Sequence, residues 1–91
     1  MFNSHLLIPS HVQAQEVSDE TVLLDLESEV SFGLDEIGTR VWQLIRESGD
    51  PEAIFDTILS EYEVSAEQLE SDLDALYEKL LQAGLVVRGD E

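Results

Sequence analysis

The sequence contains no cysteine, and only four of its 91 residues are basic. Without cysteine the chain forms no disulfide framework and no thiolate metal site, and it has no cysteine nucleophile. No apolar run approaches the roughly 20 residues that span a bilayer, and Leu6-Leu7-Ile8 is too short for the core of a signal peptide. We therefore expect one cytoplasmic domain that does not enter a membrane.

The shortage of basic residues contrasts with 21 acidic ones, which give a net charge of −17. Such a chain repels nucleic acid and anionic membrane surfaces, so neither is expected as a partner. From Glu61 to Glu78, where a DNA-binding protein of this size would place its recognition helix, there are seven acids and no base. The charge either attracts a basic peptide or protein, or serves solubility alone.

Groups suited to catalysis or metal binding are also scarce. No glycine-rich phosphate loop is present, and neither histidine stands in a motif with a serine and an acid. His5 and His11 lack the neighbouring ligands of a metal site. Ser71 lies inside a predicted helix, whereas an acyl-carrier protein needs its serine at a helix start. We expect no enzyme activity, no metal and no cofactor.

Three short runs of alternating residues, from His11 to Val17, from Val22 to Glu27 and from Val30 to Leu34, predict strands. In the second run, the apolar series that begins at Val22 alternates with one that contains Leu23 and Asp25, which is typical of a strand with one buried face. Polar turns separate the runs. The sequence therefore predicts an antiparallel meander whose third strand lies at the edge.

Asp25 is the one carboxylate within an apolar strand, and we expect it either to cap a turn or to pair with Arg40. Residues 1–10 show no clear period and contain Pro9, so they are predicted to form a flexible arm. Its apolar residues are able to pack, so the arm is either free or laid against the domain, which spans residues 11–88.

At Asp35 the apolar period changes from two to that of a helix, and Asp35 is a suitable N-cap. Gly38 in the first turn suggests a close backbone approach. Trp42 is expected to close the core with one edge exposed to water. Asp50-Pro51-Glu52 predicts the start of a second helix.

Ser65 to Gln68 fits a capping box at the start of the third helix, and Gly84 fits its C-terminal stop. The segment Leu85-Val86-Val87 either adds a short strand or seals the base. The predicted fold class is α+β: a winged-helix-like arrangement of a three-stranded antiparallel sheet followed by three helices.

One stretch also resembles a known family. Leu23-Leu24-Asp25-Leu26, a short turn, and the run Phe-Gly-Leu-Asp-Glu-Ile-Gly-Thr-Arg-Val-Trp that ends at Trp42 resemble the PqqD family of small peptide chaperones. These proteins are the stand-alone form of the RiPP recognition element, which binds leader peptides of ribosomally made, modified natural products. The resemblance covers roughly Val12 to Val87. The chain departs from the pattern in its acidity and in the turn Glu27-Ser28-Glu29, which lacks the expected glycine.

Two features of the sequence agree with peptide binding by strand addition. The edge strand has unpaired backbone groups, and the third helix has an apolar stripe wider than one neighbour would cover. That stripe is either wholly core or partly exposed. The resemblance implies that a leader peptide pairs with the third strand and lies against the third helix. The implied backbone is that of Glu29, Val30, Ser31 and Phe32, and the implied wall is Leu69, Asp72, Leu73, Leu76 and Lys79 or Leu80.

The resemblance implies a non-catalytic protein that captures a precursor leader peptide and presents it to a processing enzyme. That enzyme is either a leader peptidase with a cyclase, as in lasso peptide biosynthesis, or a radical enzyme, as in the pyrroloquinoline quinone pathway. The alternative is an acidic adaptor that binds a protein partner through its helical face and leaves the edge strand unused.

Overall fold

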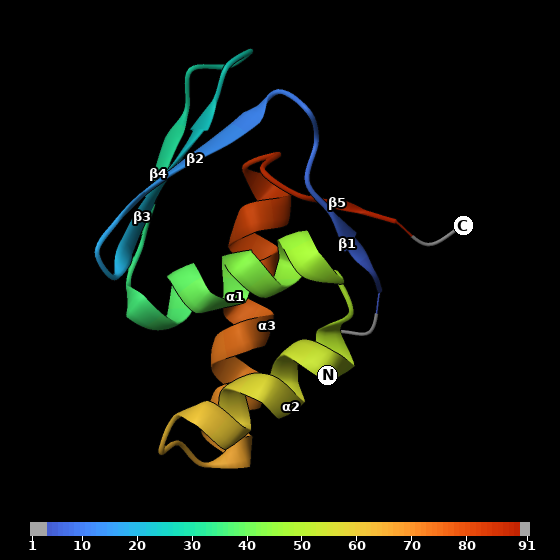
Figure 1. Cartoon of the computed structure of the whole chain (residues 1–91). Helices are drawn as coiled ribbons and strands as arrows, with labels where there is room; N and C mark the ends of the chain where they lie inside the picture. The colour runs from blue at the N-terminus through green and yellow to red at the C-terminus, as the bar shows by residue number, and fades with distance from the viewer. Residues whose placement is uncertain (1–3, 90–91) are drawn as a thin grey trace.

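The computed structural model describes residues 4–89. Three strands form one sheet, and three helices follow on one side of it (Figure 1). The elements in order are β1 Leu6–Leu7, β2 Val12–Val17, β3 Glu20–Asp25, β4 Ser31–Leu34, α1 Glu36–Glu47, α2 Pro51–Glu61, α3 Ala66–Gln82 and β5 Val87–Arg88. The predicted α+β fold, a three-stranded antiparallel sheet followed by three helices, is confirmed. Within residues 4–89 no helix has the length and apolar character needed to cross a bilayer.

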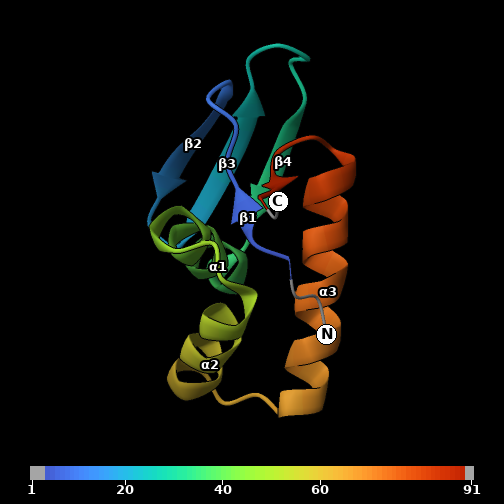
Figure 2. The same ribbon diagram turned by 90° about the vertical axis from the view of Figure 1, so that its right-hand side faces the viewer.

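The sheet has the order β2-β3-β4, and both pairs are antiparallel. Strand β3 is central, and Leu23 lies opposite Ala14 on one side and Phe32 on the other. Strand β4 is therefore one edge of the sheet. Figure 2 shows that this edge lies beside α3.

The period of two predicted for β3 is confirmed. The buried side chains, however, are not those of the apolar series that begins at Val22. Thr21, Leu23 and Asp25 face inward, whereas Val22 and Leu24 are 52% and 38% exposed. The inner face packs against α1, where the Thr21 hydroxyl donates a hydrogen bond of 2.8 Å to the buried Thr39 hydroxyl. This paired polar contact makes Thr21 a suitable inward residue, because a buried hydroxyl needs a partner.

Asp25 caps the turn between β3 and β4, as one of the two expectations held. Its Oδ1 accepts hydrogen bonds from the backbone N–H groups of Glu27 (2.9 Å) and Ser28 (3.3 Å). These donors, the Glu27 amide above all, lower the pKa of Asp25 below its usual value. The other expectation, pairing with Arg40, is wrong, because the guanidinium of Arg40 makes two 2.9 Å hydrogen bonds to the carboxylate of Glu61.

Part of the segment predicted as an arm over residues 1–10 lies against the domain in a regular element. Leu6–Leu7 form β1, which pairs with β5, and Leu6 is buried in the core. The Leu6 N–H donates to the carbonyl of Gly49 (2.9 Å). Residues 1–3 lie outside the described part of the chain. The segment after Gly84 has both of the roles expected for it. It supplies strand β5, and its residues Leu85 and Val86 are buried in the core.

Trp42 is only 2% exposed, so the prediction of one wet edge is wrong. Ile8, which the sequence left in the arm, packs against the core, and it lines one surface pocket together with Val12 and Trp42.

The ends of α1 and α3 follow their local signals. Asp35 accepts from the Gly38 N–H (2.8 Å), and Ser65 accepts from the Gln68 N–H (3.1 Å). The capping box is incomplete, because the Gln68 side chain donates to Asp72 (2.9 Å) instead of reaching back to the cap. At the other end the N–H of Leu85 bonds the carbonyl of Leu80 (2.9 Å), which confirms the Schellman ending.

Candidate functional site

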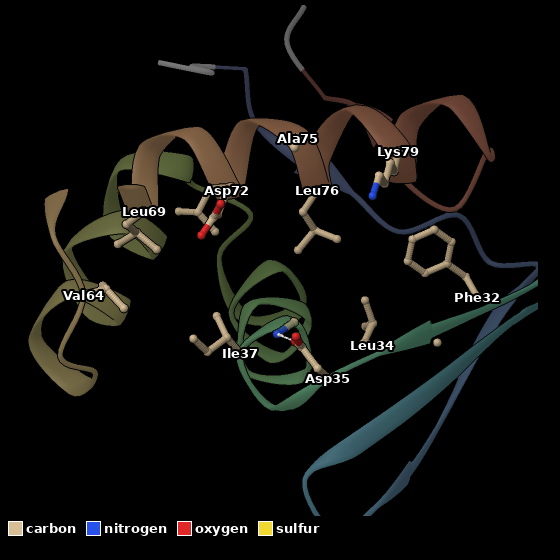
Figure 3. A pocket seen from close by; sticks show the side chains of 13 residues that line it. Phe32, Leu34, Asp35, Ile37, Val64, Leu69, Asp72, Ala75, Leu76 and Lys79 are labelled. Atoms are coloured by element: carbon tan, nitrogen blue, oxygen red, sulfur yellow. Dashed lines mark hydrogen bonds between the residues drawn. The ribbon is translucent and has the colours of Figure 1, made fainter. Parts of the chain in front are cut away.

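A groove of about 480 Å³ runs between α3 on one side and β4 with the first turn of α1 on the other (Figure 3). Its lining is mainly apolar. The lining residues are Phe32, Gly33, Leu34, Asp35, Ile37, Gly38, Val64, Leu69, Asp72, Leu73, Ala75, Leu76 and Lys79.

Some side chains that line the groove are buried, and others remain partly exposed. Leu34, Leu69 and Leu73 are buried and belong to the core. Phe32 and Leu76 pack against that core but stay half-buried, and they face one another from β4 and α3. These side chains stay partly exposed to water in the free protein. A ligand that covers them would be stabilised by the burial of this apolar surface.

Gly38 lets α1 begin directly against β4. A Cβ at this position would lie 3.2 Å from the Leu34 Cβ and 3.2 Å from the Asp35 Oδ1. The groups that approach Gly38 closely are therefore the side chains of the two residues before α1, and the expected backbone approach is not what the structure has.

The register of the sheet determines which backbone groups of β4 are free. The N–H of Asp25 donates to the carbonyl of Val30 (2.9 Å), so these two residues form a hydrogen-bonded pair. Antiparallel pairs alternate between bonded and non-bonded, and Leu23 opposite Phe32 is therefore the next bonded pair. It follows that Ser31 and Gly33 point their N–H and C=O groups away from β3, toward the open edge.

The groove contains one basic side chain, Lys79, at the end where Phe32 lies. In the part of the chain that the structure describes, Lys79 makes no ion pair, whereas the groove's two carboxylates already accept hydrogen bonds. Asp35 caps α1, and Asp72 accepts from Gln68. The groove thus offers apolar contact, an open strand edge and one cation.

The residues singled out from the sequence divide into three groups. The groove brings together Phe32, Leu69, Asp72, Leu73, Leu76 and Lys79. Glu29, Val30 and Ser31 precede Phe32 along the same exposed chain segment but are not part of the groove lining.

Leu80, which the resemblance gave as the alternative to Lys79, is the third group, and it does not line the groove. It is 1% exposed in the core, so a peptide in the groove would not reach its side chain. Leu73, Tyr77 and Leu80 follow one another along the core face of α3, and Leu76 and Lys79 occupy the neighbouring groove face.

Sequence reasoning missed part of the lining. These residues are Gly33, Leu34, Asp35, Ile37, Gly38, Val64 and Ala75. Several of them were recognised only for local roles, as a strand residue, a cap or a helix glycine. Their shared position depends on the packing of α3 beside β4, which no local pattern specifies.

The fold also brings His11 to 3.8 Å from a carboxylate oxygen of Asp25 and 3.8 Å from one of Glu27. Nevertheless, among residues 4–89 no group of three or more histidine, aspartate or glutamate side chains is arranged to hold a metal ion.

Comparisons with known proteins agree with this architecture. The family described as "Coenzyme PQQ synthesis protein D (PqqD)" matches residues 20–86. The solved structure "TbiB1 in Complex with the TbiA(beta) Leader Peptide" has a TM-score of 0.83 and 36% identity, over 92% of this chain and 98% of that one. "Lasso peptide synthetase B1 complexed with the leader peptide" shares the fold, with a TM-score of 0.82 and 23% identity over 92% and 99%. A search of the curated proteins found no match.

Proposed function

Because this chain belongs to the PqqD family, we propose that it captures the leader region of a ribosomal precursor peptide and presents it to a processing enzyme. The observation that carries this proposal is the open edge of β4 beside an apolar groove, in a chain 36% identical to TbiB1, whose structure was solved with a leader peptide. We expect the capture to take place in the cytoplasm, where ribosomal precursors are made.

In the proposed complex the leader adds as a strand to β4. The outward N–H and C=O groups of Ser31 and Gly33 bind its backbone. Alternate leader side chains enter the groove and cover Phe32 and Leu76. Main-chain hydrogen bonds provide affinity, and the shape of the groove selects which side chains fit. Lys79 adds a positive charge at the groove end near Phe32.

The proposed role is binding without catalysis. The groove presents carboxylates that are engaged in a helix cap and a side-chain hydrogen bond, and it contains no histidine or hydroxyl nucleophile. The chemical step therefore belongs to the processing enzyme, which is either a leader peptidase acting with a cyclase or a radical enzyme.

Fluorescence polarisation tests this proposal with two labelled probes: the TbiA(beta) leader peptide, and the leader of the precursor encoded beside this chain. We expect saturable binding of at least one leader and none of a scrambled peptide of the same composition. If neither leader binds saturably, the proposed function is wrong.

A further inference from the structure

The outer face of the β2-β3-β4 sheet turns away from the helices (Figure 1). Its central strand carries a row of exposed apolar side chains. Val22 and Leu24 project from β3, and Leu26 continues the row into the turn, where it is 51% exposed. The side chains next to the row are uncharged or absent, because Leu24 lies opposite Gln13 and Ser31, and Val22 lies opposite Gln15 and Gly33. We call Val22, Leu24 and Leu26 the outer row.

The outer row is not covered on the side of β4, the strand proposed to bind the leader. A Cβ built at Gly33 would meet no atom within 4 Å. Three apolar side chains aligned on one sheet face are a contiguous patch rather than scattered exposed residues, and such patches on a small protein mark interaction surfaces.

The charges around the outer row have one sign. Residues 12–34, which contain all three strands, include six acidic residues and no lysine or arginine. Two of the six are not on the outer face, because Glu16 pairs with Arg46 of α1 and Asp25 is buried in the turn. Glu20 lies on this face at one end of the sheet, opposite Val17. Glu27 and Glu29 lie in the turn at the other end. A complementary partner therefore presents an apolar centre flanked by lysine or arginine side chains. A second copy of this chain does not fit, because each carries a net charge of −17.

The outer row is continuous with the proposed peptide site. A strand added to β4 directs alternate side chains into the groove and the remaining ones onto the outer face. Those remaining side chains would extend the apolar surface beyond Ser31 and Gly33, the β4 residues that lie opposite Leu24 and Val22. Binding of the leader therefore enlarges this face from three strands to four.

We propose that the outer row docks the processing enzyme through an apolar surface with a basic rim, and that the bound leader forms part of the same interface. This inference rests on the proposed function. Its consequence is that the enzyme binds the leader-loaded protein more tightly than the empty one.

The test uses the purified processing enzyme encoded with the precursor, in biolayer interferometry with and without saturating leader. The variant Val22→Thr/Leu24→Thr removes apolar contact and places threonine, a β-branched residue that suits a strand, at both positions. The matched control is Leu7→Thr/Val87→Thr, which alters a second exposed apolar pair, on the β1–β5 ribbon. Thermal melts and leader titrations accompany every variant.

We expect the enzyme to bind the loaded wild type about tenfold more tightly than the empty protein. The outer-row variant should lose about tenfold or more of that affinity while it keeps its fold and its leader affinity. The control variant should resemble the wild type, and added salt should weaken the complex.

Equal enzyme affinity for the wild type and the outer-row variant, or an equal loss in the control, would overturn this inference. Failure of the wild type to bind the enzyme would do so too. A wild-type dimer in sedimentation that the outer-row variant abolishes would assign the face to self-association instead. These results differ from failure of the proposed function, in which the wild type does not bind the leader at all.

Discussion

Glu29 adopts a left-handed backbone conformation, with φ of 64°, at the end of the β3–β4 turn. Its N–H donates to the carbonyl of Asp25 (2.7 Å), so this conformation closes the hairpin. An L-residue with a side chain is strained there, whereas glycine is not. The missing glycine is therefore a local source of instability next to the edge strand.

Replacing Glu29 by glycine should raise the free energy of unfolding by about 0.5–1 kcal/mol, because the relief of strain exceeds the added flexibility of the unfolded chain. Urea denaturation followed by circular dichroism measures the change. Glu27→Gly is the matched control, because Glu27 lies in the same turn without a positive φ. Glycine at this position should lower the stability of the protein. A Glu29→Gly protein no more stable than the wild type would contradict the expectation.

Asp25 should make the stability of the hairpin depend on pH. Its pKa is lowered in the folded state, chiefly by the Glu27 amide, so its carboxylate stabilises the fold above the unfolded pKa near 3.8. That contribution disappears as the pH falls through the lower, folded pKa. Asp25→Asn should therefore be less stable than the wild type at pH 7, and the difference should shrink below about pH 4.

Chemical denaturation at pH 7 and at pH 3 measures the effect of Asp25→Asn. Glu63→Gln, which removes one negative charge from an exposed connection, is the control for net charge. A gap between Asp25→Asn and the wild type that does not change with pH would show that the Asp25 charge is unimportant.

Leu76 and Leu73 should separate binding from folding. Leu76 is half-buried in the groove, whereas Leu73 is buried in the core. Leu73→Ala should cost about 2–5 kcal/mol of stability, the usual range for a buried leucine, and Leu76→Ala clearly less. Leu76→Ala should also weaken leader binding. Thermal melts and polarisation titrations on both variants decide, and equal destabilisation by the two would place Leu76 in the ordinary core.

At the scale of elements, successive residues of β4 point their backbone N–H groups alternately toward β3 and toward the open edge. Phe32 bonds inward to β3, and Ser31 presents its N–H to the open edge. The two neighbouring residues therefore have different backbone roles, although both lie in one short strand between the sheet and the groove.

Proline scanning should expose this difference. Ser31→Pro should leave the fold largely intact and impair leader binding, because it removes an outward amide. Phe32→Pro should destabilise the domain, because it breaks the ladder to β3. Circular dichroism and a polarisation titration measure both effects, with Ser31→Ala as the control that keeps the amide. Normal leader binding by a folded Ser31→Pro protein would exclude β4 as the docking edge.

At the scale of the whole molecule, charge separates this winged-helix-like fold from DNA-binding proteins with a similar arrangement of helices. Its net charge is −17, and α3 contains a single basic residue, Lys79. We expect no shift of duplex DNA in a gel at physiological salt, because a phosphate backbone and this surface repel each other. A shift at protein concentrations below about 1 µM would contradict the electrostatic argument.

The sequence by itself determined the features that depend on residues close together in the chain. The Asp35 cap and the Gly84 ending of α3 follow from hydrogen bonds within a few residues, and the structure has both. The Asp25 turn was one of two expectations, and it is present as well. The three strands follow from runs of alternating residues, although in β2 only Val12 is buried. The fold class follows from the order of these elements. The groove between β4 and α3 was expected from the family resemblance, since no local pattern specifies it.

Only the tertiary structure decided which side chains are buried and which distant segments lie side by side. The two sides of β3 both carry apolar residues, and the packing of α1 with the Thr21–Thr39 contact selected Leu23 for the core and left the outer row exposed. The pairing of β1 with β5 joins opposite ends of the described chain. On α3 the position of β4 assigned Leu76 to the groove and Leu80 to the core. Local propensity cannot make these choices, because the free energy of burial depends on which surface arrives opposite.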